Sequence, residues 1–119
     1  MHDRVRKDLW GYQPKELSTE DMIQEKYQGI RPAPGYPACP EHTVKKDIFT
    51  ILQTDEIGMQ LTDSMAMHPA SSVSGFYFAH PDAKYFSVDK IDEDQLEDMA
   101  SRRSVPIKQL RKWLGPNLR

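Results

Sequence analysis

The spacing of apolar residues predicts helices at both ends of the chain and one before its middle. Val5 and Leu9 lie four residues apart among charged residues, which is typical of one face of a helix. Ser18 suits a helix N-cap, and Asp21 completes a variant of the capping box. Gly29 can end this second helix. The remaining predicted helices span 42–57, 92–103 and 106–114.

Alternating β-forming residues predict three strands in the second half of the chain, at 59–67, 72–79 and 85–91. The connections between them are short, which favours antiparallel pairing over a crossover. We therefore expect an α+β fold in which an antiparallel sheet is flanked by helices. Most aromatic side chains of these runs are expected in the core. Because three strands leave two open sheet edges, the pattern also suggests part of a larger fold.

Length, charge and cysteine content exclude several classes of protein. The chain has 119 residues, which suits a single domain or a domain fragment. Its 16 Lys and Arg residues against 18 Asp and Glu residues give a net charge of -2, so no basic surface for nucleic acid or an anionic membrane is expected. Apolar runs are too short to span a bilayer. A single cysteine and the lack of a secretory signal lead us to expect a cytoplasmic protein.

The segment 31–40, RPAPGYPACP, is the most unusual part of the sequence. Its four prolines remove amide donors, so we expect an extended, pre-ordered loop rather than a helix or a central strand. Arg31 can grip a carboxylate, Gly35 lets a ligand approach the backbone, and Tyr36 offers a flat ring. These groups suit a ligand with a carboxylate at one end and a base at the other. Composition alone favours the alternative of a surface loop with Arg31 in a structural ion pair.

No catalytic or metal-binding residue is predicted. Cys39 and His42 have Cys-x-x-His spacing, but the second pair of a zinc site is missing. His42 lies near a predicted helix start, where the helix dipole disfavours its charged form, and a capping or buried hydrogen-bonding role stays open. Ser74 precedes Gly75, but the G-x-S-x-G motif of a nucleophile elbow is absent.

The segment 28–43, QGIRPAPGYPACPEHT, closely resembles the C-terminal activation domain of cobalamin-dependent methionine synthase. The similarity covers essentially the whole chain. It continues in VRK at 5–7, WGY at 10–12, SVSG at 72–75, YF at 77–78, HPD at 80–82 and WLGPNL at 113–118.

The resemblance implies a role in repairing the cobalamin cofactor, which another domain holds. In this family the activation domain binds S-adenosylmethionine, whose methyl group, with one electron from flavodoxin or a related reductase, converts cob(II)alamin to methylcobalamin. The implied protein is a methyltransferase of methionine biosynthesis that contacts its own cobalamin-binding domain. The chain alone is not expected to be catalytic.

The resemblance also implies particular binding residues. The family motif R-x-x-x-G-Y falls on Arg31, Gly35 and Tyr36. Arg31 would hold the methionyl carboxylate, and the backbone from Ala33 to Tyr36 would hold the adenosyl part. The full set of implied cofactor-binding residues is Arg31, Ala33, Gly35, Tyr36, Tyr85 and Phe86.

The sequence departs from the family pattern at three points. His68-Pro69-Ala70 stands where Trp-Pro-Gly is common, and Phe86 replaces a second tyrosine. The family domain is also roughly two ordinary domains long, and its first half, which carries an acidic residue for the ligand's ammonium group, is missing. We therefore expect 1–119 to be the C-terminal portion of the activation domain. The alternative function is an interaction module that docks on the cobalamin domain or flavodoxin without ligand affinity of its own.

Overall fold

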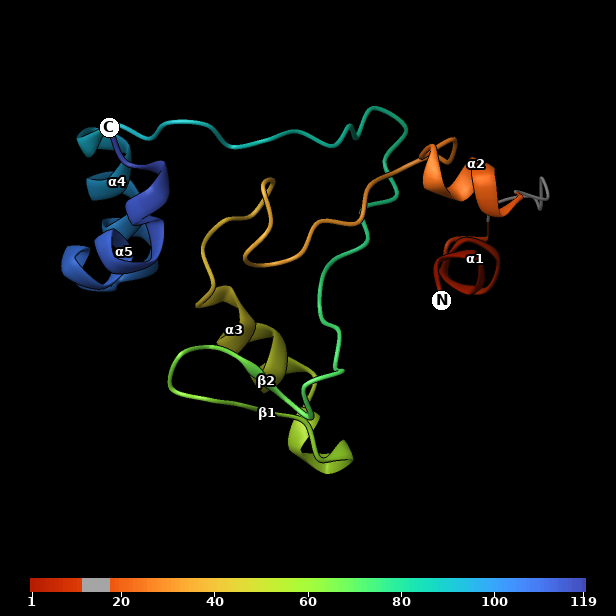
Figure 1. Cartoon of the computed structure of the whole chain (residues 1–119), viewed down its shortest axis with the longest axis horizontal. Helices are drawn as coiled ribbons and strands as arrows, with labels where there is room; N and C mark the ends of the chain where they lie inside the picture. The colour runs from red at the N-terminus through yellow and green to blue at the C-terminus, as the bar shows by residue number, and fades with distance from the viewer. Residues whose placement is uncertain (12–17) are drawn as a thin grey trace. The chain divides into compact units, whose positions relative to one another are not determined.

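The computed structural model describes residues 1–11 and 18–119. The segment 11–14 after the first predicted helix lies largely within residues 12–17, outside the described residues. Two compact units are formed, one from Met1–Ile30 with Tyr77–Lys84 and the other from Arg31–Phe76 with Tyr85–Arg119. Figure 1 shows the path of the chain through both units. None of the described helices is long and apolar enough to cross a membrane.

The first unit begins with helix α1, His2–Arg4, which continues into a π-helical segment at Val5–Leu9. Helix α2, Thr19–Ile23, has the predicted capping box. Ser18 Oγ accepts a hydrogen bond from the amide of Asp21 at 3.0 Å, and the Asp21 carboxylate accepts one from the amide of Ser18 at 3.1 Å. The prediction that α2 extends to Gly29 is wrong, because Glu25 takes a left-handed conformation at φ 57° and ends the helical path.

The second unit contains the main apolar core. Helix α4, Glu93–Arg103, packs against helix α5, Ile107–Leu114, as Figure 1 shows at the blue end of the chain. Both agree with the predicted helices. A short 3-10 helix at Gly115–Asn117 follows α5. The buried core residues, two from each helix, are Leu96, Ala100, Leu110 and Leu114.

The predicted helix at 42–57 is divided into two pieces. Helix α3 spans Val44–Ile51, and a 3-10 helix spans Thr54–Ile57. Gln53 separates them because it takes a left-handed conformation at φ 50°. Gly58 follows at φ 73°, a left-handed conformation that glycine takes readily at the end of a helix.

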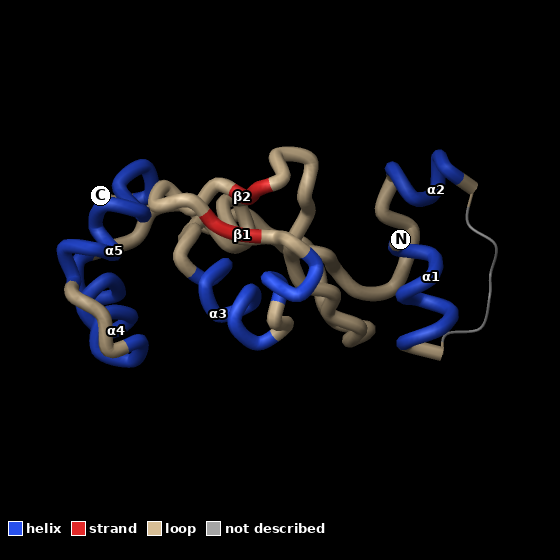
Figure 2. Tube along the Cα trace, turned by 90° about the horizontal axis from the view of Figure 1, so that it is seen from below, coloured by secondary structure: helices blue, strands red, loops and turns tan. Residues whose placement is uncertain are grey.

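The sheet is smaller than predicted. Among the described residues, strands are confined to β1, Gln60–Leu61, and β2, Met67–His68, which pair antiparallel and are red in Figure 2. The α+β class is confirmed, but the single strand predicted at 59–67 is instead a hairpin of β1 and β2, and the strands predicted at 72–79 and 85–91 are wrong. Segment 72–79 bonds to the proline-rich loop, where the Phe76 amide donates to the Pro32 carbonyl at 2.8 Å. Proline has no amide to donate in return, so a ladder cannot extend along this loop.

Segment 85–91 is held by separate attachments rather than by a ladder. The Val88 amide donates to the Pro37 carbonyl at 2.7 Å, and Ile91 forms a single parallel bridge with Leu118. The Asn117 side-chain amide donates to the carbonyls of Val88 and Asp89, both at 3.1 Å. The aromatic residues of these runs are also less buried than predicted, since Phe78, Tyr85 and Phe86 are exposed.

Asn117→Ala is expected to lower the free energy of unfolding by about 1 to 2 kcal/mol, because it removes two hydrogen bonds that tie 85–91 to the end of the chain. Urea denaturation followed by circular dichroism measures this change. Gln24→Ala, which removes one exposed hydrogen bond from the residue after α2 to Glu20, serves as control and should cost less than about 0.5 kcal/mol. Equal losses in the two variants would contradict an anchoring role for Asn117.

Candidate functional site

The proline-rich loop folds back on itself through backbone hydrogen bonds. The Gly35 amide donates to the Cys39 carbonyl at 2.8 Å, and the Cys39 amide donates to the Tyr36 carbonyl at 2.9 Å. The Tyr36 amide donates to the Ala33 carbonyl at 3.2 Å. Gly35 has φ 91°, a conformation that side-chain-bearing residues rarely take. The loop is therefore ordered, as predicted, but the expectation that it is extended is wrong, because these backbone hydrogen bonds turn it back between Ala33 and Cys39.

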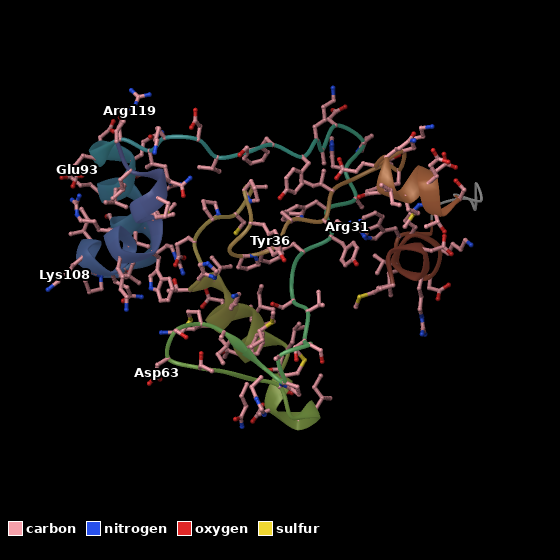
Figure 3. The ribbon with its side chains drawn as sticks, in the orientation of Figure 1. Arg31, Tyr36, Asp63, Glu93, Lys108 and Arg119 are labelled. Atoms are coloured by element: carbon pink, nitrogen blue, oxygen red, sulfur yellow. The ribbon has the colours of Figure 1, made fainter. Side chains whose placement is uncertain are left out.

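This loop forms one wall of a pocket of about 520 Å³ in the second unit. Arg31 and Tyr36, labelled in Figure 3, both come from the loop. Tyr85, at the start of segment 85–91, also lines the pocket. The lining residues are Arg31, Ala33, Pro34, Gly35, Tyr36, His42, Lys45, Met67, Ser72, Val73, Ser74 and Tyr85. The structure thus brings together five of the six predicted cofactor-binding residues, while Phe86 does not line this pocket and is 57% exposed.

Two glycines allow the walls of the pocket to approach one another closely. A Cβ on Gly35 would lie 2.9 Å from both ring nitrogens of His42 and closer still to Cε1. A Cβ on Gly75 would lie 3.0 Å from the Pro32 carbonyl oxygen and 3.1 Å from the Ala33 Cβ. Position 35 leaves no room for a methyl group, so packing as well as conformation requires glycine there, whereas a methyl group at position 75 would need its neighbours to shift by a few tenths of an ångström.

The buried Lys45 and the adjacent His42 line the pocket together with the loop. Lys45 Nζ is 3.1 Å from His42 Nδ1 and donates to the Met65 carbonyl at 2.9 Å. Burial lowers the pKa of Lys45. Burial, and then the positive charge of Lys45, lower the pKa of His42, while Glu41 acts in the opposite direction. His42 is therefore neutral near pH 7.

The end of the loop is attached to α4 by an ion pair. The buried Glu41 carboxylate is paired with Arg103 and accepts a hydrogen bond from the Thr43 amide at 2.7 Å. Arg103 also contacts Thr43 Oγ1 at 3.3 Å. Burial raises the pKa of the Cys39 thiol. Within the described part of the chain, no three His, Cys, Asp or Glu residues come together in a cluster that suits a metal ion.

The family model of the vitamin B12 dependent methionine synthase activation domain matches residues 1–104 of the chain. The chain belongs to this family. The resemblance predicted from the proline-rich segment is therefore confirmed.

A solved structure with a similar sequence and fold supports this family assignment. This chain is 56% identical in sequence to the chain in the crystal structure of the MetH reactivation domain bound to AdoHcy, and the two structures match with a TM-score of 0.91. The match covers 98% of this chain and 37% of that chain. The 119 residues therefore span little more than a third of that relative's length.

Sequence reasoning did not single out several residues that line the activation-domain pocket. Ser72 and Val73 are indicated only by the SVSG similarity, Ser74 is otherwise considered only as a nucleophile, and no signal indicates Met67. Lys45 follows His42 by three positions, a spacing that brings two side chains together on a helix. That spacing was available as a signal, but it does not reveal the Met65 carbonyl that holds the lysine in place.

Proposed function

We propose that this chain is the S-adenosylmethionine-binding part of a cobalamin-dependent methionine synthase, serving the reductive methylation of cob(II)alamin to methylcobalamin. The observation that carries the proposal is the convergence of Arg31, Gly35 and Tyr36 on one pocket. Membership of the activation-domain family supports it, as does the similarity to a reactivation domain bound to AdoHcy.

The chemistry of the pocket fits such a ligand. Its volume of about 520 Å³ suits a small organic molecule. The Arg31 guanidinium supplies paired donors for a carboxylate, and the ring of Tyr36 supplies a flat apolar face for a base. The bare backbone at Gly35 lets the ligand reach main-chain hydrogen-bonding groups. The chain's part is to bind and position, and the cobalamin supplies the metal-centred methyl chemistry.

We further propose that residues 1–119 are the C-terminal portion of the activation domain. The proposed partners are the cobalamin-binding domain and flavodoxin or a related reductase. The share of the reactivation-domain chain that is matched, 37%, supports this placement within a longer protein. On this proposal the chain contributes to a methyltransferase without being catalytic alone.

A second candidate function is an interaction module without ligand affinity of its own. Three large apolar residues of the second unit, Ile51, Leu52 and Ile57, are exposed around the end of α3. Exposed apolar side chains that form a contiguous patch are typical of a protein contact surface.

A calorimetric titration of the 119-residue chain with S-adenosylmethionine tests the two functions, after circular dichroism has established that the chain is folded. We expect binding, and weaker binding of methylthioadenosine, which lacks the amino-acid carboxylate that Arg31 would hold. A folded chain that binds neither compound would contradict the proposed ligand site and favour the interaction module.

A further inference from the structure

The contact between Lys45 and His42 determines which ring nitrogen carries the proton. Lys45 is only 7% exposed, and its Nζ lies 3.1 Å from His42 Nδ1. An ammonium group donates hydrogen bonds and cannot accept them. Nδ1 must therefore be the acceptor, which leaves it without a proton. The proton of neutral His42 then sits on Nε2.

Packing fixes the orientation of this ring from two further sides. Gly35 presses against the ring edge that joins Nδ1 and Nε2, since a Cβ there would lie 2.9 Å from either nitrogen. The ring of Trp113, on α5, packs against His42 with centroids 5.6 Å apart and a tilt of 49°. His42 also lines the pocket. The ring therefore cannot turn freely to exchange its two nitrogens.

We propose that His42 donates a hydrogen bond from Nε2 to an uncharged acceptor of the ligand, and that Lys45 is the positioning residue that keeps the proton on that nitrogen. The proposal rests on the proposed function and deepens it. It assigns to the pocket a neutral donor that recognises a ribose hydroxyl or a base nitrogen of an S-adenosyl compound. Arg31 remains the group for the carboxylate.

The charges around His42 explain why a neutral donor is useful here. Lys45 and Arg31 already bring two positive charges to the pocket. A protonated His42 would add a third, beside an ammonium group 3.1 Å away. S-adenosylmethionine carries a positive sulfonium, so a charged ring would also repel the ligand. Lys45 and Glu41 act electrostatically on His42, and the other titratable groups that line the same pocket are Arg31, Tyr36 and Tyr85.

Nitrogen-15 NMR of the 119-residue chain tests the role of Lys45 without any ligand. We expect the neutral His42 ring to be protonated at Nε2 and unprotonated at Nδ1. In Lys45→Met the repelling charge is gone, so we expect the His42 pKa to rise and the proton to distribute over both nitrogens. Protonation at Nδ1 in the wild type would overturn the proposal directly, even where the variant fails to fold.

Titration with S-adenosylhomocysteine tests the role of His42 toward the ligand. We expect His42→Phe to weaken binding about tenfold, and His42→Gln, which keeps a donor near Nε2, to bind more tightly than His42→Phe. His68→Phe replaces an exposed histidine outside the pocket and should leave affinity unchanged. Unchanged affinity in His42→Phe would overturn only the donor role, whereas a folded wild type without affinity would overturn the proposed function as well.

The pH profile separates a proton-positioning role from a purely structural one. Because the His42 pKa is lowered, affinity for S-adenosylmethionine should be constant above about pH 6.5 and fall as pH drops through that pKa, since the charged ring then repels the ligand's sulfonium. In Lys45→Met the pKa rises, so the fall should begin at a higher pH. A profile that stays in place while overall affinity changes would reduce Lys45 to a packing residue and overturn its proposed role.

Discussion

Arg31→Ala is expected to weaken binding of S-adenosylmethionine by about 1.5 to 3 kcal/mol, or about 10- to 150-fold in Kd. The guanidinium lines the pocket at the start of the proline-rich loop and is proposed to hold the ligand carboxylate through paired, charge-assisted hydrogen bonds. Alanine removes both donors and the positive charge. Calorimetric titration of the wild type and the variant under identical salt conditions measures the loss.

Two further arginine variants sharpen this experiment. Arg31→Lys keeps the charge but loses the planar fork, so we expect an intermediate affinity. Arg119→Ala removes an exposed arginine whose carboxylate partner is Asp92, outside the pocket, and should leave Kd unchanged. A folded Arg31→Ala variant that binds as tightly as the wild type would remove Arg31 from the proposed ligand site.

Features that depend on local sequence were predicted well. The cap formed by Ser18 and Asp21 involves residues three positions apart, and the structure has both of its hydrogen bonds. The helices α4 and α5 follow from apolar residues at helical spacing, and Leu96 and Leu110 are fully buried where their faces meet. In each case the signal and the contact lie within a few residues of chain.

The strands at 72–79 and 85–91 were not predictable from alternation alone. Alternating β-forming residues indicate an extended backbone, but a strand also needs a partner that both donates and accepts. The partner of Phe76 is Pro32, which only accepts, and Val88 bonds to Pro37. The prolines that made the loop recognisable in the sequence are also what prevents a wider sheet.

The candidate site was predicted in part for a similar reason. Arg31, Gly35 and Tyr36 belong to one short motif, so a single loop was enough to bring them together. The position of the Lys45 ammonium group depends on a hydrogen bond to the Met65 carbonyl, twenty residues away, and no local sequence pattern predicts that contact. Phe86 is adjacent to Tyr85 in sequence but does not line the pocket with it. Its role in cofactor binding stays a prediction.

Gly35→Ala is expected to lower the free energy of unfolding by about 2 to 4 kcal/mol and to abolish most ligand affinity. Two effects add. Alanine is strained at φ 91°, and its methyl group would collide with the His42 ring, which Trp113 and Lys45 hold from other sides. Relief of the collision requires either the loop or the ring to move, and both line the pocket.

Gly58→Ala is the matched control for this variant, because it separates backbone strain from the collision. Gly58 has a similar positive φ of 73°, but nothing lies within 4 Å of the place where its Cβ would stand. We expect it to cost about 1 to 2 kcal/mol, from backbone strain alone, and to bind S-adenosylmethionine like the wild type. Thermal or urea denaturation gives the stabilities and calorimetry gives the affinities. If both variants lost the same stability and kept full affinity, the close contact between Gly35 and His42 would have no part in shaping the site.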